Sequence, residues 1–509
     1  YGEVKMAQLA LTRSTDTGVK KMATMLENDH NKIIKDLKGY AAKNGIVTNE
    51  YVDRRKDSLV YCVADSLMGR SPKNMLVPTL GELMKKRNPE AKVYGLSLKD
   101  RAAILMTGNN ADCALWLDTK QGGLGTSKYY KIPTWLAAFN AKNQPSSAQG
   151  RVWEAIGSIY KPPTPDEMNK RMKENNGQMV PLPRPTPSQL LSLHDDAEWE
   201  GKFPAGGRAF PHKIPSAREP EFWEAYVKSP FSIDWLFDGA KACIENADLG
   251  KDTTTDMLCI GVSTTDEIGH LFGPNSREMK EIIIASDRIL SGFLTYLDRT
   301  VGDGNYVVVV SSDHGVADVP ERLRVMGQNP AERSAGRIKE RDAVRAIESH
   351  YSQTFVNSAT LNNVPALNMD GTVAQSSQSQ SATENDMFVR HIEPPSIFID
   401  TTQFTKVKWN VNAQLDTICA VLKRVPGIGI ALKTKDVIAG KKPADMDKDI
   451  FSYIRNSVYA QRTGDILFYP SINWIIGSKT TTHGTPYMYD RHVPLFFMGG
   501  DIEPSAIMD

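Results

Sequence analysis

Two aspartates and three histidines stand at positions from which they could bind divalent ions. Asp266 and His270 are four residues apart, and Asp313 is followed directly by His314. His483 lies beside a glycine in the run TTTHG. If the segment around Asp266 is helical, Asp266 and His270 share one face and can close on a single cation. The ordinary alternative for each piece is an aspartate that caps a helix or forms a turn, with an unrelated histidine.

The chemistry of these side chains favours one kind of metal site. Carboxylate and imidazole ligands without thiolate suit zinc in a hydrolytic site, with manganese or another divalent ion as the second choice. The five cysteines are scattered and form no C-x-x-C pair, so a zinc–thiolate site is not indicated.

Two apolar runs precede the acidic candidates. Residues 305–315, NYVVVVSSDHG, contain four consecutive valines, which predict a strand buried on both faces inside a helix-covered parallel sheet. Residues 257–263, MLCIGVS, predict a second strand that ends just before Asp266. Ligands gather at the carboxyl edge of such sheets, so both strand ends are expected near an active site.

An amphipathic helix is expected between these two strands. Asn275 and Glu278 have the spacing of a capping box, and apolar residues recur at three- and four-residue intervals as far as Leu297. Strand, helix and strand form a crossover that is right-handed by default, which places Asp266 and Asp313 at the same edge of one sheet. The expected fold class is therefore α/β, with a mostly parallel central sheet flanked by helices.

A third strand, residues 92–97, precedes two cationic side chains. Lys99 and Arg101 are two residues apart, so in an extended segment before a helix they point the same way. An ammonium beside a forked guanidinium suits the oxygens of a phosphoryl group. The alternative is two solvated surface cations.

The composition excludes some partners. The 509 residues include 61 basic and 60 acidic side chains, a net charge of +1, which gives no general attraction to nucleic acid. No apolar run approaches the roughly 18 residues of a membrane helix, so no membrane span is expected. Residues 119–256 are rich in tryptophan, tyrosine and proline and are interpreted as a cap inserted over the active edge, where His194 and His212 are expected to be structural.

A family resemblance rests on six motifs taken together. They are GIVTNEY, SPKNMLVPTLGE, GLSLKDRAAIL, STTDEIGHLFGP, SSDHG and TTHGTPYMYDRHVPLFFMG. Through them, residues 45–507 resemble the alkaline phosphatase superfamily, in the branch of phosphate-irrepressible bacterial alkaline phosphatases related to type I phosphodiesterases and nucleotide pyrophosphatases. Residues 1–44 resemble a family of small, all-helical bacterial envelope proteins of uncharacterised function.

The resemblance implies a domain organisation and a partner. Residues 1–44 would be a helical segment foreign to the phosphatase fold, and residues 45–509 a phosphatase-like domain, incomplete at both ends, with the cap insertion at 119–256. The implied substrate is a small phosphate monoester. The implied protein is a monomer that is periplasmic or secreted.

The resemblance also implies roles for the candidate residues. One zinc ion would be held by Asp266, His270 and His483. Half of a second zinc site would come from Asp313 and His314. Phosphoryl oxygens would be bound by Lys99, Arg101 and Asn49.

Two parts that the resemblance implies are not found in the sequence. They are a metal-binding aspartate on the first strand of the sheet and a threonine nucleophile that becomes phosphorylated. The expectation is therefore a zinc-dependent alkaline phosphatase by lineage, a fragment or fusion with one complete zinc site and impaired catalysis. The alternatives are a phosphodiesterase or nucleotide pyrophosphatase, and a non-catalytic protein that binds metal and phosphate.

Overall fold

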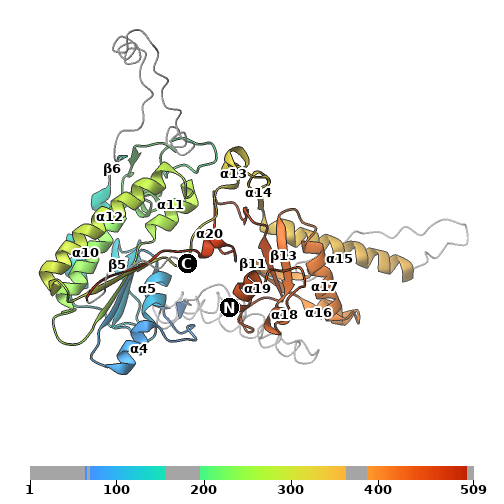
Figure 1. Cartoon of the computed structure of the whole chain (residues 1–509), viewed down its shortest axis with the longest axis horizontal. Coiled ribbons are helices and arrows are strands. Elements are labelled where there is room, and N and C mark those ends of the chain that lie inside the picture. The colour runs from blue at the N-terminus through green and yellow to red at the C-terminus, as the bar shows by residue number, and fades with distance from the viewer. Residues whose placement is uncertain (1–63, 66–68, 156–194, 363–386, 501–509) are drawn as a thin grey trace, which may run out of the picture. The chain divides into compact units, whose positions relative to one another are not determined.

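The computed structural model describes residues 64–65, 69–155, 195–362 and 387–500 (Figure 1). The chain divides after Val60 into two compact units, and the described residues belong to the second. Asn49, His194 and the opening segment 1–44 lie outside the described residues. The described part has an α/β fold, as predicted.

The central sheet has the strand order β5-β4-β3-β8. Its strands are β3 (Val93–Ser97), β4 (Cys113–Asp118), β5 (Gly123–Gly125) and β8 (Met257–Gly261). β3 pairs in parallel with both β4 and β8, and only β5 is antiparallel to its neighbour. The prediction of a mostly parallel sheet is confirmed.

Helices cover both faces of this sheet. They include α5 (Asp100–Thr107) and α10 (Pro230–Asn246), and α12 (Arg277–Leu297) packs on α10 through Phe293 and Phe237. A Cβ atom at Gly95 of β3 would lie 2.6 Å from Thr107 Cγ2, so this glycine allows α5 to pack closely on one face. The next residue, Leu96, contacts Gly239 of α10. Because successive side chains of a strand point to opposite faces, α5 and α10 lie on opposite sides.

The helical segment after β8 differs in part from the prediction. The chain turns directly into α11 (Thr264–Phe272), as expected. The cap of α12 is Ser276, whose hydroxyl accepts a hydrogen bond from Met279 N at 3.1 Å, so the predicted capping box of Asn275 and Glu278 is wrong. Glu278 is fully buried, and its Oε1 lies 2.9 Å from His212 Nε2. The Glu278 carboxylate therefore contacts the buried His212 ring, and Ser276 caps the helix.

The run of valines forms a strand, but not the one predicted. β9 (Val307–Ser311) pairs antiparallel with β16 (Leu495–Gly499), and among the described residues these two strands form a sheet of their own. Val307 and Val309 are more than half exposed. The predictions of a strand buried on both faces, and of one sheet shared with β8, are therefore wrong for the described residues. Valine favours extended backbone, but burial requires covering elements that a strand sequence does not specify.

A second, antiparallel sheet is covered on both faces. Its order is β11-β12-β14-β13, formed by β11 (Val389–Glu393), β12 (Ser396–Ile399), β13 (Ile428–Lys433) and β14 (Ile466–Pro470). Ile466 and Phe468 of β14 enter one apolar cluster, and Leu467 and Tyr469 enter another. The helices of this region are α15 (Glu340–Asn362), α16 (Thr401–Lys406), α17 (Val411–Leu422), α18 (Thr434–Ile438) and α19 (Lys448–Asn456).

The remaining elements connect these regions. The short strands are β1 (Ala64–Asp65), β2 (Gly69–Arg70), β6 (Val152–Trp153), β7 (His212–Lys213), β10 (Gly336–Ile338) and β15 (Trp474–Ile476). The helices are α4 (Leu80–Arg87), α6 (Leu136–Lys142), η1 (Pro145–Ala148), α9 (Phe222–Val227), η2 (Asp298–Gly302), α13 (Pro320–Met326), α14 (Pro330–Arg333) and α20 (Met488–Arg491). Among the described residues, no helix combines the length and apolarity needed to cross a membrane.

Candidate metal centre

Asp266 and His270 are brought together by the helix that follows β8. They lie one turn apart on α11, and His270 Nε2 is 3.2 Å from Asp266 Oδ1. The strand ends at Gly261 and the helix begins at Thr264, so the ligands stand at the carboxyl edge of the central sheet. The i, i+4 geometry predicted for this pair is observed.

His483 joins this pair from a distant loop. Its Nε2 lies 3.6 Å from Asp266 Oδ1, and its ring centroid is 5.1 Å from that of His270. The next residue, Gly484, has φ of 106°, a conformation that glycine adopts without steric cost. One ligand atom from each of Asp266, His270 and His483 lies within 4.8 Å of the others, and all three residues are partly buried.

A hydrogen bond behind His270 fixes its orientation. His270 Nδ1 lies 2.9 Å from the carbonyl oxygen of Thr481, which can only accept, so Nδ1 carries the proton. Nε2, the other ring nitrogen, faces Asp266 and lies where it can act as a metal ligand. Such a bond from the other ring nitrogen is the usual support of a metal-binding histidine. The Thr481 hydroxyl in turn donates to the carbonyl of Ala317 at 2.7 Å.

Asp313 and His314 are not equally close to this cluster. The His314 ring stacks on His483 with centroids 3.4 Å apart, and its Nδ1 donates to the Gly315 carbonyl at 2.8 Å. The Asp313 side chain is 86% exposed, and its Oδ2 lies 3.5 Å from His314 Nε2. The structure therefore brings His314 to the edge of the cluster and leaves Asp313 in solvent.

Asp490 connects the two loops that carry these histidines. Its carboxylate accepts hydrogen bonds at 2.7 Å from both the backbone N and the hydroxyl of Thr485, and its carbonyl accepts from Gly315 N at 2.7 Å. A Cβ atom at Gly315 would lie 2.1 Å from the Tyr489 carbonyl oxygen, so only glycine permits this approach. Asp490 was not among the residues predicted from the sequence. It is the aspartate of YDRH, shortly after TTHG, and this position near the candidate ligand His483 could have indicated it.

The two predicted phosphate-binding cations have different surroundings. Lys99 Nζ donates to Asp266 Oδ2 at 2.6 Å and lies 3.0 Å from Glu267 Oε1. Arg101 is exposed on the first turn of α5. The helix begins at Asp100, so Lys99 is its N-cap in extended backbone and Arg101 lies in its first turn; the shared phosphate-binding role of the two side chains stays a prediction.

The charges around Lys99 and Asp266 support each other. Burial acts to lower the pKa of Lys99, but the hydrogen bond to Asp266 and the charges of Glu267 and Asp266 raise it above its usual value. Burial acts to raise the pKa of Asp266, but Lys99, His270 and His483 together lower it. Asp266 is thus held as a carboxylate, the form that binds metal ions.

His483 is held in the neutral form. Burial, together with repulsion from His314 and His270, lowers the pKa of His483 to about 4 despite the opposing attraction of Asp266 and Asp313. At neutral pH its imidazole therefore offers a lone pair. One carboxylate oxygen and two imidazole nitrogens, partly buried and within reach of one another, fit a zinc-type divalent ion with positions left open for other ligands.

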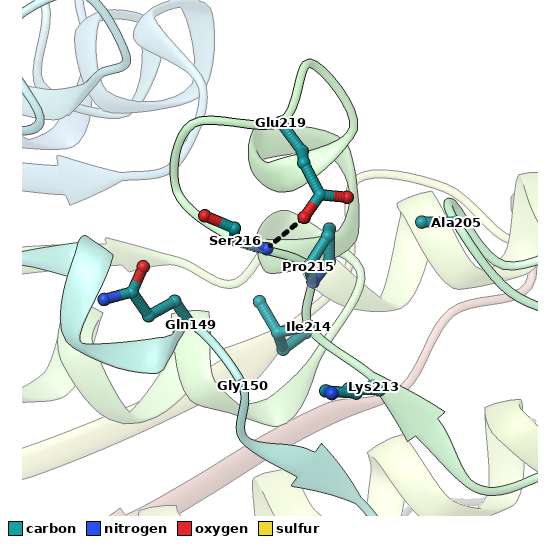
Figure 2. A pocket seen from close by; sticks show the side chains of 8 residues that line it. All are labelled: Gln149, Gly150, Ala205, Lys213, Ile214, Pro215, Ser216 and Glu219. Atoms are coloured by element: carbon teal, nitrogen blue, oxygen red, sulfur yellow. Dashed lines mark hydrogen bonds between the residues drawn. The ribbon is translucent and has the colours of Figure 1, made fainter.

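Two cavities in the described part of the chain are lined by residues outside this cluster. One, of about 400 Å³, is lined by Gln149, Gly150, Ala205, residues 213–216 and Glu219 (Figure 2). Among these residues, Ser216 N donates a hydrogen bond to Glu219 Oε1. The other, of about 380 Å³, lies between residues 196–200 and the side chains of Phe272, Val319 and Arg322. Neither cavity is lined by a predicted site residue, so the candidate site rests on the ligand cluster alone.

The fold and the cluster define an α/β protein with a candidate metal centre at the carboxyl edge of its sheet. Residues 39–492 match the model of the type I phosphodiesterase / nucleotide pyrophosphatase family, and the chain belongs to that family of phosphoester hydrolases. Residues 1–61 match a domain of unknown function, DUF4142. Both predicted resemblances are confirmed.

Curated relatives cover most of the chain. The alkaline phosphatase PafA of Elizabethkingia meningoseptica is 27% identical over 478 residues, which are 90% of this chain and 76% of that protein. The alkaline phosphatase PhoV of Synechococcus elongatus is 27% identical over 480 residues, or 91% of this chain and 74% of the relative. A protein of Myroides odoratus described as a calcium-transporting ATPase is also 27% identical, over 91% of this chain and 76% of its own length.

Solved structures of PafA share the fold. The wild-type enzyme superposes with a TM-score of 0.67 at 26% identity, covering 88% of this chain and 76% of PafA. A PafA variant with four substitutions superposes with a TM-score of 0.66 at 25% identity, covering 87% and 74%.

Proposed function

We propose that this chain is a zinc-dependent hydrolase of phosphate monoesters. The observation that carries the proposal is the convergence of Asp266, His270 and His483 with an ammonium group, Lys99 Nζ, 2.6 Å from Asp266. A zinc ion bound there supplies Lewis-acid stabilisation of charge on a phosphoryl group. Membership in the phosphoester hydrolase family and the likeness to PafA and PhoV support this chemistry.

The side chains around that ion have two proposed roles, metal binding and phosphate binding. Asp266, His270 and His483 hold it, and His314 stands beside them as a candidate for part of a second site. Lys99 supplies a positive charge for a phosphoryl oxygen, and Asn49 and Arg101 remain predicted contacts. We assign no nucleophile among the described residues; the hydroxyl of Thr481, close to the cluster, donates to the Ala317 carbonyl.

The test measures binding and turnover separately. Zinc is titrated into chelator-treated protein by calorimetry, and turnover is then compared for p-nitrophenyl phosphate and bis(p-nitrophenyl) phosphate. The proposal expects tight zinc binding and faster turnover of the monoester. Faster turnover of the diester would assign a phosphodiesterase instead, and tight zinc binding without turnover of either ester would assign a binding protein. Failure of wild-type protein to bind zinc would overturn the proposed metal centre.

The matched variant for this test is Lys99→Ala. Because Lys99 is not one of the three candidate ligands, zinc should still bind to the variant. Inorganic phosphate should bind to the zinc-loaded variant at least about tenfold more weakly, the effect of losing one charge-assisted hydrogen bond. Unchanged phosphate affinity would remove Lys99 from the proposed site.

A further inference from the structure

The ammonium group of Lys99 lies between two carboxylates from the same helix. Its Nζ is 2.6 Å from Asp266 Oδ2 and 3.0 Å from Glu267 Oε1. Asp266 and Glu267 are consecutive residues in the first turn of α11, where acidic side chains also interact favourably with the helix dipole. Successive residues of a helix point about 100° apart, so the two carboxylates approach the ammonium from different sides.

Glu267 has a second partner behind it. Lys228 Nζ lies 3.3 Å from Glu267 Oε2, and the Lys228 side chain is only 10% exposed. Lys228 follows α9 directly and also contacts Glu224 at 3.1 Å, but Glu224 is 58% exposed. Four charges of alternating sign thus run from Lys228 through Glu267 and Lys99 to Asp266.

The two carboxylates around Lys99 differ in what else they must do. Asp266 Oδ1 faces both imidazoles of the cluster, at 3.2 Å and 3.6 Å, so this carboxylate is also a candidate metal ligand. A bound cation would draw on the negative charge that holds Lys99. Glu267 belongs to no metal-ligand group among the described residues, so its charge remains available to the lysine.

We propose that Glu267, braced by Lys228, is a positioning residue that keeps the Lys99 ammonium beside the cluster when a metal ion binds Asp266. This inference rests on the proposed function, in which Lys99 contacts a phosphoryl oxygen. Lysine is a point charge on a flexible stem that loses rotamer entropy when it is fixed, so an unheld ammonium loses much of its attraction for a phosphoryl group. A partner that holds the ammonium in place before phosphate arrives reduces that loss.

The test follows how fast an amine-reactive reagent labels Lys99, by peptide mass spectrometry, with and without zinc. In wild-type protein, zinc should change the labelling rate by less than about twofold, because Glu267 still holds the ammonium. In Glu267→Ala, labelling should be slow without zinc, because Asp266 holds Lys99, and at least about tenfold faster with zinc, the effect of losing a charge-assisted contact. Zinc repels the ammonium in both proteins, so the difference between them measures what Glu267 contributes.

The matched control is Glu224→Ala, which removes the other carboxylate partner of Lys228 without touching Lys99. It should behave as wild type, whereas Lys228→Met should give an intermediate response to zinc.

Inorganic phosphate should bind about tenfold more weakly to zinc-loaded Glu267→Ala than to wild type. Tighter phosphate binding by this variant, or equal labelling responses in Glu267→Ala and wild type, would overturn the positioning role. If wild-type protein binds no zinc, the proposed function fails first, and the positioning role fails with it.

Discussion

The antiparallel sheet β11-β12-β14-β13 and the strand pair β9–β16 are both rich in apolar residues, yet only one of them is buried. Every residue of β14 is buried between two apolar clusters. In the described structure, the valines of β9 and the apolar residues 495–498 of β16 are largely exposed. The difference lies in the covering elements, because helices pack on the first sheet while the second pair keeps an exposed apolar surface. Exposed apolar strands of this kind mark places where a protein contacts something else or aggregates.

The same difference extends to the candidate metal ligands. Asp266 and His270 stand on α11, which is anchored by β8 in the covered central sheet, and they meet His483 within ligand distance. Asp313 follows the exposed strand β9 and its side chain is in solvent. After the exposed strand only the ring of His314 reaches the cluster, where it stacks on His483, while Asp313 does not join it.

The largest expected effect is on the free energy of unfolding, when a phenylalanine of each strand region is replaced by alanine. Phe468 of β14 is fully buried and Phe497 of β16 is 55% exposed. Phe468→Ala should lower the free energy of unfolding by about 3–5 kcal/mol, because it removes a large side chain from the core and leaves a cavity. Phe497→Ala should change it by less than about 1 kcal/mol, as for other surface substitutions. Urea unfolding measures both, and a comparable loss in the two variants would show that β16 is covered in solution.

The next effect compares two aspartates as metal ligands. Asp266→Ala should weaken zinc binding at least about 100-fold, since losing even an outer-shell partner of a zinc ligand costs roughly 10–100-fold. Asp313→Ala should change the affinity of the tight site by less than about threefold, because this exposed carboxylate lies outside the three-residue cluster. Competition with a fluorescent chelator measures both affinities. Equal losses would place Asp313 in the tight site.

The last comparison concerns Glu278, a buried carboxyl group whose effect is a dependence of stability on pH. Burial, with repulsion from Asp195 and Glu200, raises the pKa of Glu278 to about 9 from its ordinary value of 4.5. Because the pKa of Glu278 is higher in the folded than in the unfolded protein, its contribution to the free energy of unfolding is fully present below pH 4.5. This contribution is lost as the pH rises toward 9. The loss has a slope of up to about 1.4 kcal/mol per pH unit for one proton.

Glu278→Gln should therefore flatten the fall in unfolding free energy between pH 5 and pH 9, because its amide cannot ionise. Thermal and urea unfolding at pH 5, 7 and 9 measure the slopes. Glu198→Gln, at an exposed site, serves as the control and should keep the wild-type slope. A Glu278→Gln slope equal to that of the wild type would show that this carboxyl does not remain protonated in the folded protein.

Sequence periodicity predicted several local features well. The strands at residues 93–97, 257–261 and 307–311 and the helix carrying Asp266 and His270 are present in the structure. These predictions succeed because backbone preference and apolar spacing act over a few neighbouring residues. The i, i+4 relation of Asp266 and His270 needs nothing beyond that helix.

Other features could not be read from local patterns. The expected capping box failed because His212, 66 residues away, pairs with Glu278. The surroundings of Lys99 could not be predicted either, because both carboxylates that contact its ammonium group come from α11. Glu267 and Lys228 were missed, although Glu267 is the immediate neighbour of Asp266, since their significance depends on contacts between separate helices.

The amino-acid sequence by itself determined which side chains can bind a divalent ion and which segments are strands or helices, because ligand chemistry and backbone preference belong to the residues themselves. Only the tertiary structure decided that His483 joins Asp266 and His270, that Lys99 is held between two carboxylates, and that Asp313 stays in solvent. Those outcomes depend on which surfaces cover one another, and covering is a relation between distant segments that no single segment encodes.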